Sequence, residues 1–148
     1  MNAFVDTLIS RQDMIQDAFI EHIYLSFVAV AIGIAIALPT GVIIARYRRF
    51  AEPVIGVTAI FQTIPSLALF GFLVPILGIG SPTALIALII YALLPILRNT
   101  YAGIVGVDGS TIEAGRGMGM TRTQILRQIE LPLALPFIMA GVRTATVL

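Results

Sequence analysis

Four long apolar runs constrain what this chain can fold into more than any other feature of its sequence. The runs at residues 23–45 and 54–77 contain no charged residue, and two further runs cover residues 83–97 and 131–148. A helix needs about 20 apolar residues to cross the roughly 30 Å hydrocarbon core of a bilayer. The sequence therefore predicts an all-α, polytopic bundle of transmembrane helices with spans at about these four positions.

The composition leaves the lipid bilayer as the solvent. Hydrophobic residues make up 58% of the chain and charged residues only 11%, whereas soluble domains carry about 25% charged residues. The net charge of +1 gives no reason to expect a nucleic-acid partner. The chain has no cysteine and a single histidine, His22, so disulfides, thiolate metal sites and cysteine nucleophiles are excluded. We expect no metal site and no catalytic residue.

The two ends of the chain carry different signals. The segment before the first apolar run holds Asp6, Asp13 and Asp17 against a single Arg11. A signal peptide starts with a basic region instead, so we expect none here. The fourth run is still apolar at Leu148, and we expect the bundle to be truncated there, with further spans beyond it.

Arginine positions predict the orientation in the membrane, because short cytoplasmic loops are enriched in basic residues. Arginines cluster in the connection 46–52 and in the polar stretch 98–130, whereas the connection 78–82 carries no charge. We therefore expect the N-terminus and residues 78–82 outside, and residues 46–52 and 98–130 in the cytoplasm.

Arg143 is the one charged residue of the fourth run. A charge deep in lipid usually marks function. A long side chain near the interface can instead extend to water, and both interpretations are open for Arg143.

Polar residues and prolines interrupt the second and third runs. The candidates for lining a substrate path are Gln62, Thr63, Pro65, Ser66 and Tyr91. Proline removes a helix hydrogen bond and frees a carbonyl one turn earlier, which is tolerated in a membrane where a neighbour or a watery cavity satisfies the backbone. The alternative is that these polar groups form hydrogen bonds between packed helices.

Small residues occupy every fourth position in the middle of the first run, at Gly33, Ala37 and Gly41. This spacing is typical of a membrane helix face that approaches a neighbouring helix closely. We expect this face to pack against another span.

The polar stretch 98–130 contains two helix-start signals. Ser110 and Glu113 have the spacing of a capping box, and so do Thr121 and Gln124. Gly117 and Gly119 lie between them and can end the first helix with a positive φ. The stretch therefore predicts a helix, a glycine turn and a second helix, which carries a partial apolar stripe at 125 and 129.

This stretch resembles the EAA loop of ABC importer permeases, whose pattern is Glu-Ala-Ala, three residues, Gly, nine residues, then Ile-x-Leu-Pro. The residues that keep every spacing of this pattern are Glu113, Ala114, Gly115, Gly119, Ile129, Leu131 and Pro132. Gly115 stands where the family usually has Ala, and it weakens the helix by up to about 1 kcal/mol. The resemblance implies a coupling helix that docks on a separate ATPase, with Glu113 at the contact. The alternative for Glu113 is that it only caps its helix.

Three further stretches resemble the osmoprotectant branch of these permeases, which transports glycine betaine, carnitine and choline. They are residues 62–67, 74–80 and 94–101, and the similarity runs from about the first span to Leu148. It implies the type I, MetI-like permease fold and a prokaryotic inner or plasma membrane.

The resemblance also implies partners. A second permease chain, identical or different, completes the pathway, an extracytoplasmic substrate-binding protein delivers the solute, and an ABC ATPase subunit binds ATP and magnesium. The chain lacks the GxxxxGK[ST] phosphate loop, so we expect it to hold no cofactor and to be no enzyme itself.

Other functions stay open at this stage. The same fold serves permeases for other small solutes, such as an amino acid or a sulfonate. A secondary transporter calls for charged residues inside the spans, and the first three runs have none. A membrane anchor leaves Pro65 and its polar neighbours without a role.

Overall fold

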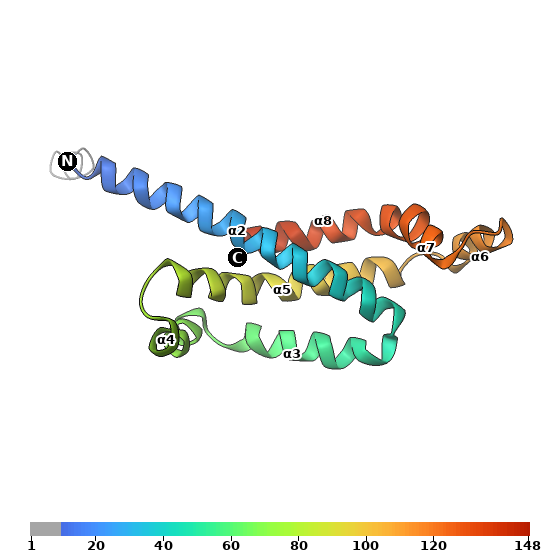
Figure 1. Ribbon diagram of the computed structural model, residues 1–148, viewed down its shortest axis with the longest axis horizontal. Coiled ribbons are helices and arrows are strands. Elements are labelled where there is room, and N and C mark those ends of the chain that lie inside the picture. Colours follow the sequence, from blue (N-terminus) through green and yellow to red (C-terminus); the bar gives the residue numbers. More distant parts are fainter. Residues whose placement is uncertain (1–9) are drawn as a thin grey trace.

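The computed structural model describes residues 10–148, which form helices and turns without a strand (Figure 1). The elements in chain order are α2 (Gln12–Arg46), a 3-10 turn η1 (Arg48–Phe50), α3 (Ala51–Thr63), α4 (Ser66–Leu77), α5 (Ser81–Val105), α6 (Gly109–Gly117), α7 (Arg122–Ile125), a π turn η2 (Leu126–Glu130) and α8 (Leu131–Val147). Three stretches are long and apolar enough to cross a membrane: α2, α5 and Arg122–Val147. The predicted all-α bundle is confirmed.

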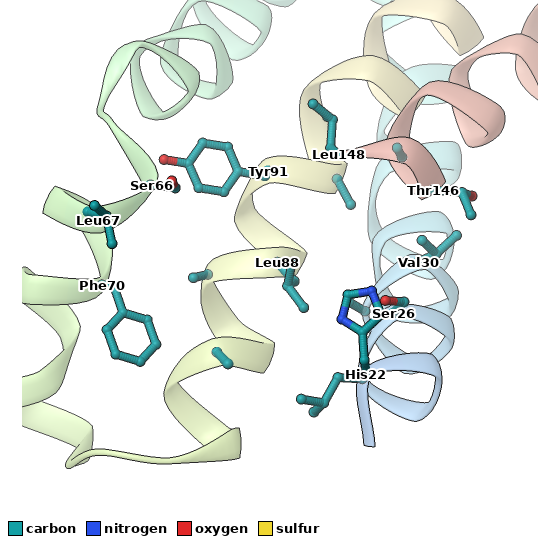
Figure 2. Close-up of a pocket in the computed structure, with 16 residues that line it drawn as sticks. His22, Ser26, Val30, Ser66, Leu67, Phe70, Leu88, Tyr91, Thr146 and Leu148 are labelled. Carbon is teal, nitrogen blue, oxygen red and sulfur yellow. The ribbon is translucent and has the colours of Figure 1, made fainter. Parts of the chain in front are cut away.

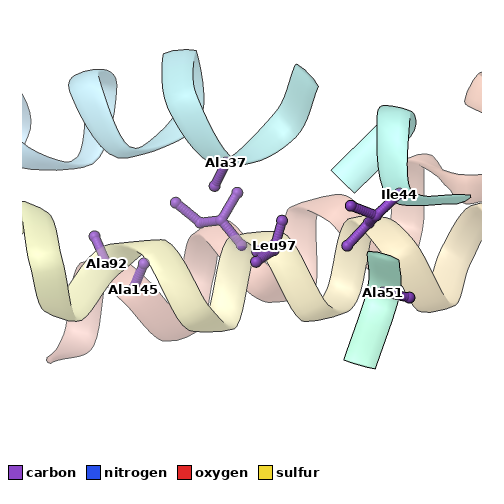
Figure 3. Packing of buried hydrophobic residues seen from close by; sticks show 7 residues of the cluster. Ala37, Ile44, Ala51, Ala92, Leu97 and Ala145 are labelled. Atoms are coloured by element: carbon purple, nitrogen blue, oxygen red, sulfur yellow. The ribbon is translucent and has the colours of Figure 1, made fainter. Parts of the chain in front are cut away.

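Helix α5 is the centre of the bundle, and its main neighbours are α2 and α8 (Figure 1). Ile96 of α5 is completely buried, and Leu97 is 2% exposed. Small side chains from the neighbouring helices surround them, including Ala37 of α2 and Ala145 of α8 (Figure 3). The core is therefore thin, and the helix backbones lie close together.

Glycines make this close approach possible. A Cβ atom added to Gly41 of α2 would lie 2.8 Å from the Cβ of Thr100 on α5, and one added to Gly33 would lie 3.1 Å from the Cβ of Ala92. On the other side, a Cβ atom at Gly141 of α8 would lie 2.6 Å from the backbone oxygen of Pro95. The predicted packing face on the first span is thus the contact between α2 and α5.

The second apolar run, which the sequence predicts as one span at residues 54–77, is bent in the structure. It forms two helices, α3 and α4, which meet at an angle of 94°. Ile64 between them is extended, with φ −73° and ψ 127°, because the ring of Pro65 disfavours a helical conformation at the residue before it. Helix α3 has 13 residues and is thus only about 20 Å long, shorter than the hydrocarbon core.

The third span is longer than expected from residues 83–97, because α5 runs from Ser81 to Val105. The first eight residues assigned to the polar stretch 98–130 thus belong to this helix. A turn with positive φ at Gly78 and Gly80 precedes it. The hydroxyl of the fully buried Thr83 donates a hydrogen bond to the Gly78 carbonyl at 2.6 Å and ties the turn to the helix.

The glycine contact between α8 and α5 is testable by adding one methyl group. We expect Gly141→Ala to lower the free energy of unfolding by about 1–3 kcal/mol, the usual cost of overpacking, because the added atom meets the backbone of α5. Gly56→Ala in α3 is the matched control, since nothing lies within 4 Å of its added Cβ. Thermal unfolding of both variants in detergent measures the difference. Equal melting temperatures for the two variants contradict the close approach.

Candidate functional site

Residues 106–130, here called the α6–α7 segment, lie at one end of the bundle, and α6 projects beyond it (Figure 1). Helix α6 begins at Gly109, and its N-cap is Asp108, which accepts a hydrogen bond from the Ser110 backbone N–H at 3.0 Å. That bond, followed by one from the Ser110 hydroxyl, lowers the pKa of the Asp108 carboxyl. The expected capping box between Ser110 and Glu113 is wrong, because the helix starts earlier and uses the aspartate.

The end of α6 is a Schellman turn centred on Gly119. Its two backbone bonds run from the Gly119 N–H to the Arg116 carbonyl and from the Met120 N–H to the Gly115 carbonyl. Gly119 has φ +79°, a conformation that L side chains rarely adopt. Gly117 lies inside the helix without a positive φ, so only the second of the two glycines ends it as expected.

The second helix of the segment starts as expected. The Thr121 hydroxyl accepts from the Gln124 backbone N–H, and the Gln124 side chain accepts from the Thr121 N–H at 2.7 Å. This capping box is confirmed. Ile125 is 3% exposed and packs, together with Ile129, against Gly115 of α6. A Cβ on Gly115 would lie 2.7 Å from the Ile129 side chain, so the glycine that departs from the family pattern sits where isoleucine fills the space.

The α6–α7 segment brings the residues of the EAA pattern into one small unit. Gly115 and Ile129 form its interior, and Gly119 forms its turn. Glu113 and Ala114 are exposed on α6, and within residues 10–148 Glu113 has neither a hydrogen bond nor an ion pair. Leu131 and Pro132 form the first turn of α8. Glu113 is thus free to meet another molecule and does not cap its helix.

The sequence did not reveal the ion pair between Arg46 and Glu130. The guanidinium of Arg46, the last residue of α2, lies 2.8 Å from the carboxylate of Glu130, the last residue of the π turn. The two residues are 84 positions apart. No local sequence pattern relates residues so far apart in the chain, so only the fold brings these two together.

Reciprocal hydrogen bonds hold the break between α3 and α4 against α5. The Gln62 side-chain amide donates to the Tyr91 carbonyl at 2.9 Å, and the Tyr91 hydroxyl donates to the Ile64 carbonyl at 2.6 Å. Pro95 lies one turn after Tyr91 and has no N–H for that carbonyl. Gln62 replaces the missing donor. For Gln62 and Tyr91, the structure therefore has the bonds between helices that the sequence left as an alternative.

A cavity of about 340 Å³ lies at the end of the bundle opposite the α6–α7 segment. Tyr91 of α5, Phe70 and Ser66 of α4, and His22 of α2 border it (Figure 2). Among the five candidate pathway residues, Ser66 and Tyr91 line this cavity and the other three do not. Thr63 donates to the Ile60 carbonyl within its own helix, and Pro65 caps α4.

Comparison with known proteins identifies the family. The family described as binding-protein-dependent transport system inner membrane component matches residues 29–148. The chain belongs to this family.

Relatives within this family are close in sequence. The glycine betaine/carnitine/choline transport system permease protein OpuCB of Bacillus subtilis is 50% identical over 127 residues, which cover 86% of this chain and 58% of the relative. The carnitine transport permease protein OpuCB of Listeria monocytogenes is 51% identical over 127 residues, with the same coverage. The chain thus spans a little over half the length of these relatives. The expected resemblance to osmoprotectant permeases is confirmed.

A solved structure agrees with this family assignment. A chain from the inward-facing MetNI methionine ABC transporter superposes with a TM-score of 0.73 and 28% identity, covering 86% of this chain and 65% of that one. The expected MetI-like permease fold is confirmed. With three long apolar helices in an inner-membrane family, the chain is a multi-pass membrane protein.

The turn at Gly119 yields a test in this permease-family chain. Gly119→Ala should cost roughly 1–2 kcal/mol, because alanine is strained at positive φ although space around it is open. Gly117→Ala has equally open space and an ordinary helical conformation, so it should be neutral or stabilising by up to about 1 kcal/mol. Hydrogen exchange of the α6 amides measures the difference. The Schellman turn is refuted if both variants protect α6 equally.

The bonds at the α3–α4 break yield a second test. Tyr91→Phe removes the donor to the Ile64 carbonyl and should lower the free energy of unfolding by about 1–2 kcal/mol. Tyr101→Phe is the control, because Tyr101 packs against the core and makes no hydrogen bond within the described chain. Melting temperatures in detergent compare the two. A Tyr101→Phe loss as large as that of Tyr91→Phe contradicts the assigned role.

Proposed function

We propose that this chain forms the membrane-spanning part of an ATP-driven importer for a compatible solute such as glycine betaine, carnitine or choline. The observation that carries the proposal is the α6–α7 segment, in which the EAA spacing lies on a capped helix beyond the bundle with Glu113 exposed and unpaired. The names of the relatives at 50% and 51% identity support the choice of solute.

The surroundings of α6 support the proposed docking of an ATPase on this helix. The helix projects past the ends of the long helices (Figure 1), and Met118 beside the turn is 75% exposed. An exposed carboxylate on this short helix and an exposed apolar side chain directly after its last residue suit a protein surface that offers a polar partner and an apolar cleft. ATP and magnesium bind in that ATPase, and this chain contributes no catalytic residue and no cofactor site.

The proposed orientation places the α6–α7 segment and Arg46 in the cytoplasm of a prokaryotic cell. The arginines that follow α2 and α5 support this orientation. The N-terminal part of α2 and the turn at Gly78–Gly80 then face outside, where the substrate-binding protein delivers its solute.

The cavity lined by Ser66 and Tyr91 is the proposed part of the solute path in this chain. It opens at the outer end of the bundle in this orientation and combines aromatic and hydroxyl groups. Gln62 and Pro65 shape its wall through the α3–α4 break, and Thr63 lies in the last turn of α3. A second permease chain, identical or different, completes the path.

Transport by the full permease chain tests the proposal. We expect proteoliposomes with the ATPase and the binding protein to take up labelled betaine, carnitine or choline only with ATP. Glu113→Ala should reduce uptake at least tenfold by weakening the ATPase contact, whereas the exposed Gln128→Ala should not. Uptake without ATP contradicts the importer class. Transport of methionine alone contradicts the proposed cargo and favours the amino-acid alternative.

A further inference from the structure

Glu130 is a buried carboxylate at the point where the α6–α7 segment becomes a membrane helix. It is 5% exposed. Its position continues the buried face of α8, which carries Ala134, Ile138, Gly141 and Ala145 toward α5 and α2. Ile129, its neighbour in sequence, packs against α6 instead. Glu130 is therefore the first residue on the side of this helix that faces α5 and α2. It directly follows Ile129, which packs against α6.

Arg46 is the only ion-pair partner of Glu130 among residues 10–148. The side chain of Arg46 is 35% exposed, whereas that of Glu130 is 6% exposed, so the arginine keeps contact with water and the glutamate does not. A second bond from the same Arg46 nitrogen reaches the Arg122 carbonyl of α7 at 3.4 Å. One guanidinium thus contacts both α7 and the start of α8.

Little else holds the α6–α7 segment to α2. Helices α6 and α7 pack on each other and on the π turn, and α2 does not pack along either of them. A polar cleft of about 360 Å³ lies between the end of α2 and the α6–α7 segment. It is lined by Arg46, Tyr47, Ile112, Arg116, Arg122, Ile125 and Glu130. The ion pair is therefore the main bridge across this cleft.

We propose that Arg46 and Glu130 are positioning residues that couple movement of the α6–α7 segment to α2 as well as to α8. The inference rests on the proposed docking of an ATPase on α6. A displacement of α6 by the ATPase is transmitted to α8 through α7 and the π turn, because these elements follow one another in the chain. It reaches the C-terminal end of α2 through the Arg46–Glu130 pair, beside the place where α2 also packs on α8.

Stability alone gives little reason for this pair. Removing one partner of a buried ion pair leaves an unpaired charge and is strongly destabilising, whereas removing both charges together leaves no charge unpaired. The double variant Arg46→Gln/Glu130→Gln therefore separates a positioning role from a folding role. The charge-swapped variant Arg46→Glu/Glu130→Arg restores a pair of opposite charges.

Coupling is measured as solute molecules transported per ATP hydrolysed, in the full permease chain reconstituted with its ATPase and binding protein. We expect the double glutamine variant to assemble in normal amounts but to show at least a fivefold lower ratio. The charge-swapped variant should recover to within twofold of the unmodified protein. Arg49→Gln, an exposed charge three residues after Arg46, is the control and should leave the ratio unchanged. A normal ratio in the double variant overturns the proposal.

A distance measurement tests the same inference without transport. The chain has no cysteine, so spin labels at Arg48→Cys in η1, directly after α2, and at Thr123→Cys in α7, both exposed positions, report the separation of these two segments in the assembled complex. We expect a narrow distribution in the otherwise unmodified protein and a distribution at least twice as wide in the double glutamine variant. Distance distributions of equal width in the two proteins overturn the positioning role, whether or not a compatible solute is transported. Widening of the distribution without transport of any compatible solute supports the positioning role and refutes the proposed cargo instead.

Discussion

The close approach of α5 to its two neighbours is the constraint on which the rest of the molecule depends. Lipid chains are as apolar as leucine side chains, so burying apolar surface between helices in a bilayer contributes little free energy. Such helices associate through close packing instead. Here glycines permit that packing on both sides of α5, with Gly41 against Thr100 and Gly141 against the Pro95 carbonyl. Because α5 is fixed between α2 and α8, its polar groups have defined positions. One of these groups, Tyr91, holds the bend between α3 and α4 through its hydrogen bond to the Ile64 carbonyl, and it also lines the cavity beside that bend.

Two backbone carbonyls near prolines lack their usual helix partners, and the hydrogen bonds that satisfy them fix α3 and α4 against α5. Within a membrane each free carbonyl or N–H needs a partner inside the protein. Pro95 leaves the Tyr91 carbonyl without its usual donor, and Gln62 supplies one. Pro65 breaks the second run, and the Tyr91 hydroxyl satisfies the carbonyl at the break. The two prolines thus act together, although Pro65 lies in the break between α3 and α4 and Pro95 lies inside α5. A pair of hydrogen bonds determines where α4 turns away from α3.

Local patterns in the sequence predicted the features that depend on neighbouring residues. The apolar runs predicted the long helices α2, α5 and α8, the four-residue spacing of small residues predicted the contact between α2 and α5, and the Thr121–Gln124 box was found as expected. The bend at Pro65 was not predicted, because proline can kink a helix as well as break it. The cap at Asp108 was missed in favour of Ser110, since both residues suit an N-cap. The Arg46–Glu130 pair and the role of Gln62 depend on contacts between distant parts of the chain, and no spacing rule reaches across 84 residues.

The π turn at Leu126–Glu130 makes the junction between α7 and α8 sensitive to chain length. In it the Leu131 N–H bonds to the Leu126 carbonyl, five residues back, whereas an α-helix bonds four residues back. Deleting one residue would let an ordinary α-helix form there. It would also turn α7 relative to α8 by about 100°, the rotation of one residue. Ile125 and Glu130 then could not both keep their present neighbours. Between these two positions, the number of residues is therefore under stronger constraint than their identity, and related chains should vary there by substitution rather than by insertion or deletion.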